Sequence, residues 1–231
     1  MSGRTAAAPS VGTLPAEVAD AARTLAALGL VSAFGHVSAR HGDRMLITPP
    51  IDLAEATADT LQDIPLDSTA LPPHAPGEAW AHLAVYRARP DVRAVARATP
   101  ESAFAAGAVA SGTIPPLHGQ GALLGDAVPV HDDARLMRSA GIAEGAARAL
   151  GHADAVVLRG NGALATGGTP GHAVARMWLL ETTCRLHLAA RQAGAVHALA
   201  SEEITSWRAA GPPLLDRLWA HLRSPGGSPP R

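Results

Sequence analysis

The chain has 231 residues, of which 47% are hydrophobic and 17% are charged, a balance typical of a compact globular protein with one sizeable core. Its 19 basic and 20 acidic residues give a formal net charge of -1, which does not favour nucleic acid or an anionic membrane as a partner. All 19 basic residues are arginines, so the sequence excludes catalysis through a lysine Schiff base. A small molecule or a protein is the expected partner.

The single cysteine, Cys184, cannot form an internal disulfide or a thiolate metal cluster, which suits a reducing cytoplasm. It falls inside a long helical pattern and is expected in the core. The N-terminal residues lack the apolar run of a signal peptide, and no stretch reaches about 18 uninterrupted apolar residues. We therefore expect a soluble, cytoplasmic protein.

One domain is expected over residues 13–223, between flexible tails at residues 1–12 and 224–231. Within it, periodicity and turn residues predict helices that alternate with short strands. In chain order, these are helix 14–28, strand 44–48, an irregular stretch 51–75 with a short strand at 64–66, helix 78–88, strand 92–98, helix 100–110, strand 128–130, helix 139–150, strands 155–158 and 163–166, and helices 170–193, 201–207 and 212–222. The hairpin-like run 155–166 argues against a purely parallel sheet. The sequence predicts an α/β fold with a central mixed or antiparallel sheet and helices on its faces.

Residues 35–40, Gly-His-Val-Ser-Ala-Arg, form a glycine-containing turn that leads into a strand. This turn could bring backbone amides, that of Gly35 among them, and the His36 side chain to a cleft. The alternative is that His36 is a solvated loop histidine.

Glu78 stands at the predicted start of a helix, and His82 follows four residues later on the same face. A helix N-terminus favours negative charge, so a carboxylate there stays ionised unless it is buried. Glu78 therefore either caps the first turn or serves as an acid/base group. His82, one turn further in, is expected to have a buried structural role.

Arg97 and Arg159 lie at the ends of predicted apolar strands. Because buried charges are rare without partners, these arginines suggest a carboxylate or another anionic group in or near a cleft. An ion pair with Glu78 or Glu101 would explain them equally well. His118 follows a proline turn and is a plausible acid/base group, since histidine titrates near neutrality.

Metal-ligand spacing is poor along the chain. No His-x-His, His-x-x-x-His or Cys-x-x-Cys occurs, and the 11 histidines are scattered. The glycine-rich stretches do not follow the strand-glycine-helix order of a dinucleotide site. The sequence predicts neither a bound metal nor a cofactor.

Five segments, in order along the chain, resemble the class II aldolase/adducin family, which includes fuculose-phosphate and rhamnulose-phosphate aldolases, ribulose-phosphate epimerase and the adducin head. The segments are 28–40, 46–49, 78–91, 114–118 and 155–162. The resemblance implies a three-layer α/β/α fold of the class II aldolase type.

In the family's metal enzymes, a His-x-His pair follows an Arg-Pro-Asp element, and a third histidine precedes the glycine of a later strand. The resemblance puts the pair on Arg97 and Thr99 and the third ligand on Asn161, so all three histidines are absent. The catalytic glutamate of the family aligns with Glu78. The resemblance therefore implies that the acid/base position is retained, while Arg97 offers a fixed cation and Asn161 a neutral hydrogen-bond partner.

The sugar-phosphate site of the family differs too. Where phosphate-binding members have Thr-Ser-Gly-Asn, this chain has Ala-Phe-Gly-His at residues 33–36. The Ser-Ser pair before the glutamate is replaced by Pro76 and Gly77. A phosphorylated sugar is therefore not the expected substrate.

The leading hypothesis is a metal-independent lyase or isomerase that acts on a small carbonyl or carboxylate compound through enolate-type acid/base chemistry, in specialised-metabolite biosynthesis. The residues expected to act are the catalytic Glu78, His118 and Arg97 and the substrate-binding His36, Arg159, Asn161 and Gly35.

Two other hypotheses remain open. One is a non-catalytic interaction protein resembling the adducin head. The other is an oxygenase-like relative that uses iron, which the absent ligands disfavour. Family members often form fourfold-symmetric tetramers, so the resemblance also implies a homo-oligomer.

Overall fold

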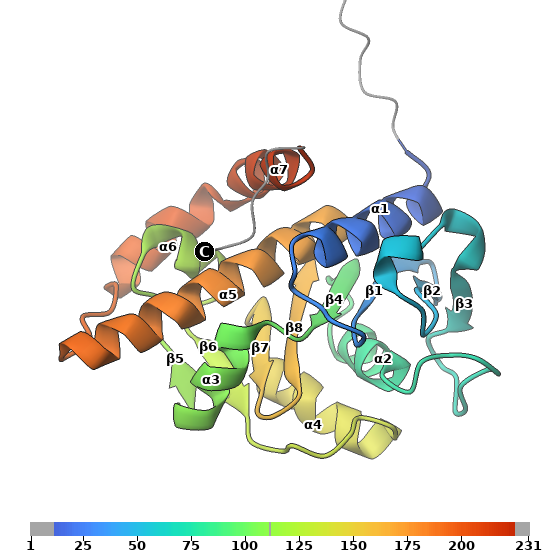
Figure 1. Cartoon of the computed structure of the whole chain (residues 1–231), viewed down its shortest axis with the longest axis horizontal. Coiled ribbons are helices and arrows are strands. Elements are labelled where there is room, and N and C mark those ends of the chain that lie inside the picture. Colours follow the sequence, from blue (N-terminus) through green and yellow to red (C-terminus); the bar gives the residue numbers. More distant parts are fainter. Residues whose placement is uncertain (1–11, 111, 225–231) are drawn as a thin grey trace, which may run out of the picture.

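The computed structural model describes residues 12–110 and 112–224. The predicted tails, residues 1–12 and 224–231, lie outside the described residues except for Gly12 and Ser224. The described chain forms a central sheet with helices on both faces (Figure 1). This is the predicted three-layer arrangement.

The sheet is mixed, as the hairpin-like run in the sequence predicts. Its eight strands are β1 His36–His41, β2 Arg44–Ile47, β3 Gln62–Pro65, β4 Ala94–Ala98, β5 Thr113–Ile114, β6 Val128–His131, β7 Ala155–Leu158 and β8 Gly162–Gly167. Their order across the sheet is β3-β2-β1-β4-β8-β7-β6-β5. The strands β6 and β7 pair in parallel, and the other neighbours pair antiparallel.

Helices cover both faces of the sheet. Their bounds are α1 Leu14–Ala27, α2 Ala79–Ala88, α3 Glu101–Val109, α4 Ala140–Leu150, α5 Pro170–Ala193, α6 Ser201–Ala209 and α7 Gly211–Leu222. Three short 3-10 helices span Leu53–Glu55, Ala58–Thr60 and Gly119–Leu124. The helices α1, α3 and α5 share one hydrophobic core with the sheet, and α2 and α4 share another on its opposite face. Figure 1 shows α7 outside α5, farthest from the sheet.

Strand β4 shows how the two faces differ. Ala94, Ala96 and Ala98 belong to the core beneath α5, where small side chains let the long helix approach the sheet closely. Val95 belongs to the core beneath α2 and α4. Because side chains alternate along a strand, Arg97 also projects toward the α2 face.

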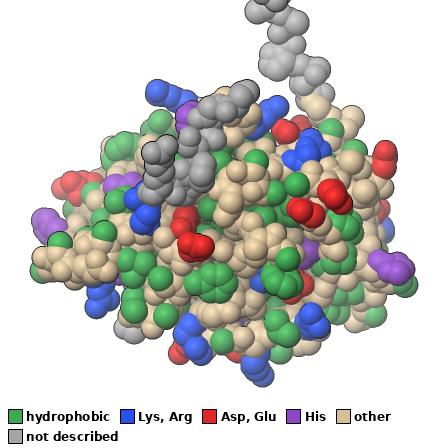
Figure 2. Space-filling model, in the orientation of Figure 1, with side chains coloured by type: hydrophobic (Ala, Val, Ile, Leu, Met, Phe, Trp, Pro, Cys, Tyr) green, Lys and Arg blue, Asp and Glu red, His purple; other side chains and the backbone are tan. Residues whose placement is uncertain are grey.

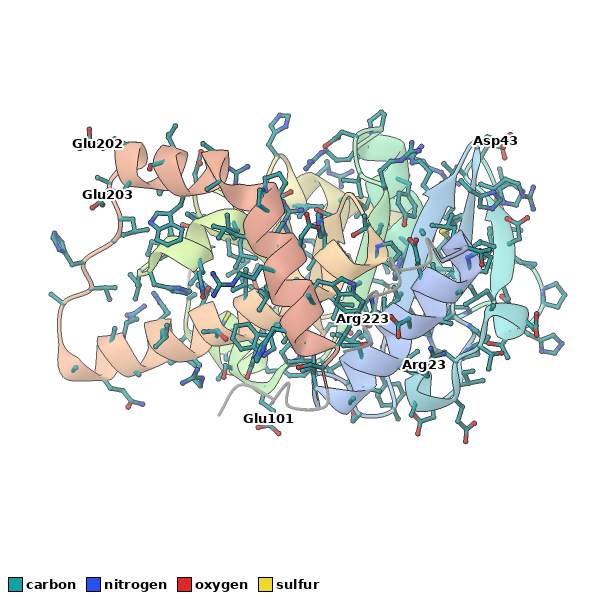
Figure 3. The ribbon with its side chains drawn as sticks, turned by 90° about the horizontal axis from the view of Figure 1, so that it is seen from above. Arg23, Asp43, Glu101, Glu202, Glu203 and Arg223 are labelled. Carbon is teal, nitrogen blue, oxygen red and sulfur yellow. The ribbon has the colours of Figure 1, made fainter. Side chains whose placement is uncertain are left out.

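Charged side chains are interspersed over the face shown in Figure 2. Near the two described ends of the chain, Asp20 on α1 lies 3.7 Å from Arg23 and 3.0 Å from Arg223. Figure 3 shows these two arginines where α7 ends above α1. Within the described residues, none of the helices combines the length and apolar character that spanning a membrane requires.

The predicted helices and strands are present, with ends that differ by a few residues. The predicted strand at 92–98 begins at Ala94, and the predicted strand at 64–66 is β3, shifted toward Gln62. Strand β5 was not predicted, because it has only two residues and no detectable periodicity. Cys184 is buried in the core, as predicted.

Candidate functional site

His36 and Arg97 lie side by side on the sheet face that α2 covers. They are register partners in the antiparallel pair of β1 and β4, so their side chains project from the same face. Both residues are buried, with 5% and 3% of their surface exposed. His36 opens β1 and Arg97 is the residue before the last in β4, so the pair stands near one end of two central strands of the sheet.

Three polar side chains from α2 and its N-cap residue lie over this face of the sheet. Glu78 is the N-cap residue, and His82 and Tyr86 follow at intervals of four, which puts all three on one side of the helix. The Glu78 side chain makes no capping hydrogen bond, so the predicted alternative of first-turn capping does not account for it. Only 15% of that side chain is exposed.

Arg97 is held by carbonyl and amide oxygens. Nη1 donates to the Phe34 carbonyl at 3.0 Å, and Nη2 donates to the carbonyl and Oδ1 of Asn161 at 3.2 and 2.7 Å. Among the described residues, Nε has no partner and neither Glu78 nor Glu101 forms the alternative ion pair. Figure 3 shows Glu101 pointing away from the fold. Burial lowers the pKa of Arg97, and the Glu78 carboxylate opposes this change.

His36 is a buried neighbour of Glu78, so the alternative of a solvated loop histidine is wrong. Its Nε2 lies 4.0 Å from Glu78 Oε2, and its Nδ1 lies 3.4 Å from Thr48 Oγ1. Burial lowers the pKa of His36 to about 4, although the Glu78 carboxylate raises it in part. His36 is therefore neutral at neutral pH.

A buried hydrogen-bond network lies beneath this pair. Ser38 Oγ is 2.7 Å from His82 Nδ1 and 2.8 Å from Tyr86 Oη. Burial lowers the pKa of His82 and raises that of Tyr86. The predicted buried structural role of His82 fits this position. Ser38 and Tyr86 are not among the predicted site residues, although Ser38 follows His36 on the same strand face and Tyr86 continues the four-residue spacing on α2.

Two glycines bring the polar oxygens onto Arg97. A Cβ on Gly35 would lie 3.1 Å from the Arg97 carbonyl oxygen, so the turn before β1 passes close to β4. Gly162 has a positive φ of 83°, and a Cβ there would lie only 2.1 Å from the Ala98 carbonyl oxygen. These close approaches place the residues that precede each glycine beside the guanidinium. Gly35 thus shapes the site through its backbone.

Two predicted site residues make other contacts. His118 Nε2 lies 3.1 Å from Thr183 Oγ1 on α5, and burial lowers its pKa. Within the described residues no hydrogen bond joins His118 to Glu78, and its acid/base role stays a prediction. Arg159 forms an ion pair with Asp132, not with either of the predicted glutamates.

The side chains at the three ligand positions implied by the resemblance are a guanidinium, a hydroxyl and an amide, from Arg97, Thr99 and Asn161. Arg97 offers only donors, and Asn161 Oδ1 already accepts from it. Across residues 12–110 and 112–224, no group of three or more His, Cys, Asp or Glu side chains is arranged to hold a metal. The donor set at these positions fits an anionic oxygen of a substrate better than a divalent cation.

An open hollow of about 310 Å³ lies where β4 ends. Both phenylalanines of the chain line it, and Phe34, whose carbonyl binds Arg97, is 64% exposed. The residues around the hollow are Gly29, Val31, Ser32, Phe34, Thr99, Glu101 and Phe104. The hollow thus has two aromatic side chains and the Glu101 carboxylate in its lining, and the Phe34 carbonyl links it to the Arg97 guanidinium.

Comparison with known proteins agrees with this architecture. Residues 16–188 match the family described as Class II Aldolase and Adducin N-terminal domain. The fold is similar to that of a solved L-fuculose 1-phosphate aldolase, with a TM-score of 0.78 and 23% identity over 85% of this chain and 95% of that one. At this identity, the likeness shows the fold alone.

Two relatives share more of the sequence. The chain is 34% identical over 223 residues to the 3,4-dihydroxyphthalate decarboxylase of Terrabacter sp. (strain DBF63), covering 88% of this chain and 93% of the relative. It is 30% identical over 195 residues to the 3,4-dihydroxyphthalate decarboxylase of Rhodococcus jostii (strain RHA1), covering 77% and 80%.

Proposed function

Since the chain belongs to the class II aldolase and adducin N-terminal domain family, we propose that it is a lyase that removes a carboxylate from a small hydroxylated aromatic acid. The two relatives named as decarboxylases support the reaction type. The observation that carries the proposal is that Glu78, neutral His36 and the buried Arg97 lie together at one end of the central strands β1 and β4. Decarboxylation is the form of the predicted lyase chemistry that these groups support best.

Glu78 is the proposed proton carrier. Loss of CO2 from a hydroxylated ring requires a proton on the ring carbon that bears the carboxylate. The Glu78 carboxylate takes the proton of the neighbouring ring hydroxyl and delivers it to that carbon, so an O–H bond breaks, a C–H bond forms and the hydroxyl carbon becomes a carbonyl. His36 lies 4.0 Å away and, being neutral, does not repel a proton carried by Glu78.

Arg97 is the proposed site for the negative charge. When the bond to the carboxylate breaks, CO2 leaves and its electron pair returns through the ring to the carbonyl oxygen, which becomes a phenolate and takes a proton from water. A buried guanidinium with an unpartnered Nε, among the described residues, stabilises such an oxygen. A preorganised donor of this kind contributes about 3 kcal/mol to a transition state.

We further propose that the reaction needs no metal ion. The positive charge that a metal would supply is present as the Arg97 guanidinium, whose burial strengthens its repulsion of a second cation. His36, Glu78 and the deeper His82 are the remaining side chains of the cluster with metal-binding atoms. Within the described residues these three are not arranged to hold a metal, and His82 is hydrogen-bonded to Ser38.

The proposal is tested with Glu78→Gln and 3,4-dihydroxyphthalate. The variant keeps the shape of the side chain but cannot carry the proton, so kcat should fall by roughly 100- to 10,000-fold. Its thermal unfolding midpoint should stay unchanged, because Glu78 makes no capping hydrogen bond. Release of CO2 and loss of substrate are measured together. The control is Glu202→Gln, which removes an exposed carboxylate on α6 (Figure 3).

Full activity of Glu78→Gln would remove this residue from the mechanism. No turnover of any hydroxylated aromatic acid by the wild type would instead favour the interaction protein resembling the adducin head. Metal content of the active preparation, measured before and after dialysis against a chelator, tests the metal proposal separately. Activity that is lost with a stoichiometric metal and returns with it would overturn metal independence and leave the decarboxylation intact.

A further inference from the structure

The loop between β6 and α4, residues 132–139, borders the candidate site on two sides. On one side, the Arg135 carbonyl oxygen accepts a hydrogen bond from Asn161 Nδ2 at 3.4 Å. On the other side, Arg138 packs against Gly77, the residue directly before Glu78. The loop therefore spans the distance between the Arg97 partner and the proposed proton carrier.

Gly77 makes room for the Arg138 side chain. A Cβ at position 77 would lie 3.0 Å from Arg138 Cγ and 3.5 Å from both Cδ and Nε, so the arginine stem runs across the glycine backbone. Consecutive Cα atoms are about 3.8 Å apart, which puts the arginine stem within one residue of Glu78. In the phosphate-binding members that the chain resembles, a serine stands at this position. Here the Arg138 stem occupies the space over Gly77, the residue next to the proposed proton carrier.

Arg138 differs from the other arginines near this end of the strands, which are Arg97, Arg135 and Arg159. Arg135 is paired with Asp133 at 2.6 Å, Arg159 is paired with Asp132, and Arg97 is held by carbonyl oxygens. The exposed Arg138 side chain has neither a hydrogen bond nor an ion pair within residues 12–110 and 112–224. Of these four guanidinium groups, that of Arg138 can therefore bind an anion from solution without first breaking a contact within the described residues.

We infer that Arg138 binds a second carboxylate of the substrate, one that stays on the product, so that the site is selective for aromatic dicarboxylates. The inference rests on the proposed function, in which Glu78 and Arg97 act on the first carboxylate and the ring oxygen. A guanidinium presents two parallel N–H donors that match a carboxylate, and the charge holds the ring with its reacting carbon toward Glu78. Arg138 is thus a specificity-determining residue.

Binding of two probes to the whole protein, measured by calorimetry, tests the inference. The first is 3,4-dihydroxyphthalate, and the second is 2,3-dihydroxybenzoate, the same hydroxylated ring without the second carboxylate. Arg138→Ala should weaken binding of the dicarboxylate by roughly 10- to 100-fold and that of the monocarboxylate by no more than about twofold. Arg148→Ala, which removes an equal charge from an exposed residue of α4, should change neither.

Two further variants separate binding from folding. Arg138→Lys keeps the charge but not the forked geometry, so it should recover part of the dicarboxylate affinity. Gly77→Ser restores a side chain where the Arg138 stem lies, and it should weaken dicarboxylate binding while Arg138 is intact. Both variants should unfold at the wild-type midpoint.

Equal losses for both probes, unchanged dicarboxylate affinity in Arg138→Ala, or no binding of either probe to the wild type would overturn the inference. Because the measurement is of binding, failure of the proposed function looks different. In that case the wild type would bind the dicarboxylate in an Arg138-dependent manner and release no CO2.

Discussion

Arg97, which is buried, and Arg176, whose side chain is 17% exposed, are two largely enclosed arginines with opposite surroundings. Arg176 on α5 donates to the carbonyl oxygens of Leu123 and Thr166 at 3.1 and 2.9 Å, and its Nη2 lies 3.1 Å from Asp154 Oδ2. Burial lowers the pKa of both guanidinium groups, and a nearby carboxylate opposes the change in each. Both arginines thus carry a desolvation penalty, and they differ in what compensates it.

The position of the carboxylate separates the two. Asp154 is in contact with Arg176 and lies 3.6 Å from Arg208, so the charge beside the hollow of about 400 Å³ at this place is neutralised within the protein. Among the described residues, no carboxylate lies within ion-pair distance of Arg97. An arginine that is paired with a carboxylate stabilises the folded state. An arginine bound only to neutral oxygens can still form an ion pair with an anionic ligand.

Exchanging each arginine for methionine tests this difference most directly. Arg97→Met should lower kcat by roughly 100- to 1,000-fold, because the developing phenolate loses its cation. Arg176→Met should leave the kcat of the folded protein within about twofold. It should instead lower the free energy of unfolding by about 3 kcal/mol, at the low end for a buried pair because Arg208 remains beside Asp154.

Steady-state CO2 release and denaturant unfolding on the same preparations give the two quantities. The comparison fails if the pattern is reversed, with Arg97→Met mainly unstable and Arg176→Met mainly inactive. Equal effects of the two substitutions on both quantities would show that the distance to a carboxylate does not distinguish the two sites.

The pH dependence of stability is a further difference between the Arg97 and Arg176 sites, because His36 lies directly beside Arg97. Its folded-state pKa of about 4 is below its ordinary value of 6.5, so the unfolded chain takes up the proton first as the pH falls. The contribution of neutral His36 is complete above pH 6.5 and is lost on acidification toward pH 4. The loss over this window is about 3 kcal/mol.

Denaturant unfolding at several pH values, with wild type and His36→Asn, measures this contribution. The variant should lose less stability between pH 6.5 and 4, although some slope should remain because burial also lowers the pKa values of His82 and His118. The exposed His197→Asn is the control and should follow the wild type. Identical curves for His36→Asn and wild type would contradict the shifted pKa.

The fold could be predicted from the sequence because its signals are local. Proline at the first turn and a glycine after the last turn predict the ends of the helix that begins at Leu14. The run 155–166 indicates the hairpin of the mixed sheet. Strand β5 could not be predicted because two residues are too few to show the alternating pattern of a strand. Its place at the edge of the sheet depends on pairing with β6, which no local signal specifies.

The candidate site could be predicted only where the family motif supplied long-range information. The motif aligned Glu78, Arg97 and Asn161 with one active site, and the structure brings these residues together. The contacts of His118 and Arg159 could not be foreseen, because their partners are far away in sequence and are set by the packing of α5 and by the loop after β6. The space that Gly77 leaves for a side chain from that loop has no sequence signal at all.

The network beneath Arg97 should show the smallest effect. Ser38→Ala removes the hydroxyl shared by His82 and Tyr86 and leaves two buried polar atoms unpaired, which should lower the free energy of unfolding by about 1–2 kcal/mol. Tyr86→Phe removes one of these bonds and should cost about 1 kcal/mol. Ser139→Ala, at an N-cap whose side chain makes no hydrogen bond, should change stability by less than about 0.5 kcal/mol.

A double-mutant cycle with Ser38→Ala and Tyr86→Phe then separates support from chemistry. The two substitutions remove the same hydrogen bond, so their effects on unfolding should be less than additive, by roughly 0.5 kcal/mol or more. If the network only supports the sheet face that carries His36 and Arg97, kcat should fall by less than tenfold in each variant. A fall as large as that of Arg97→Met would mean that Ser38 and His82 take part in proton transfer. The buried network would then belong to the catalytic site and would not only support it.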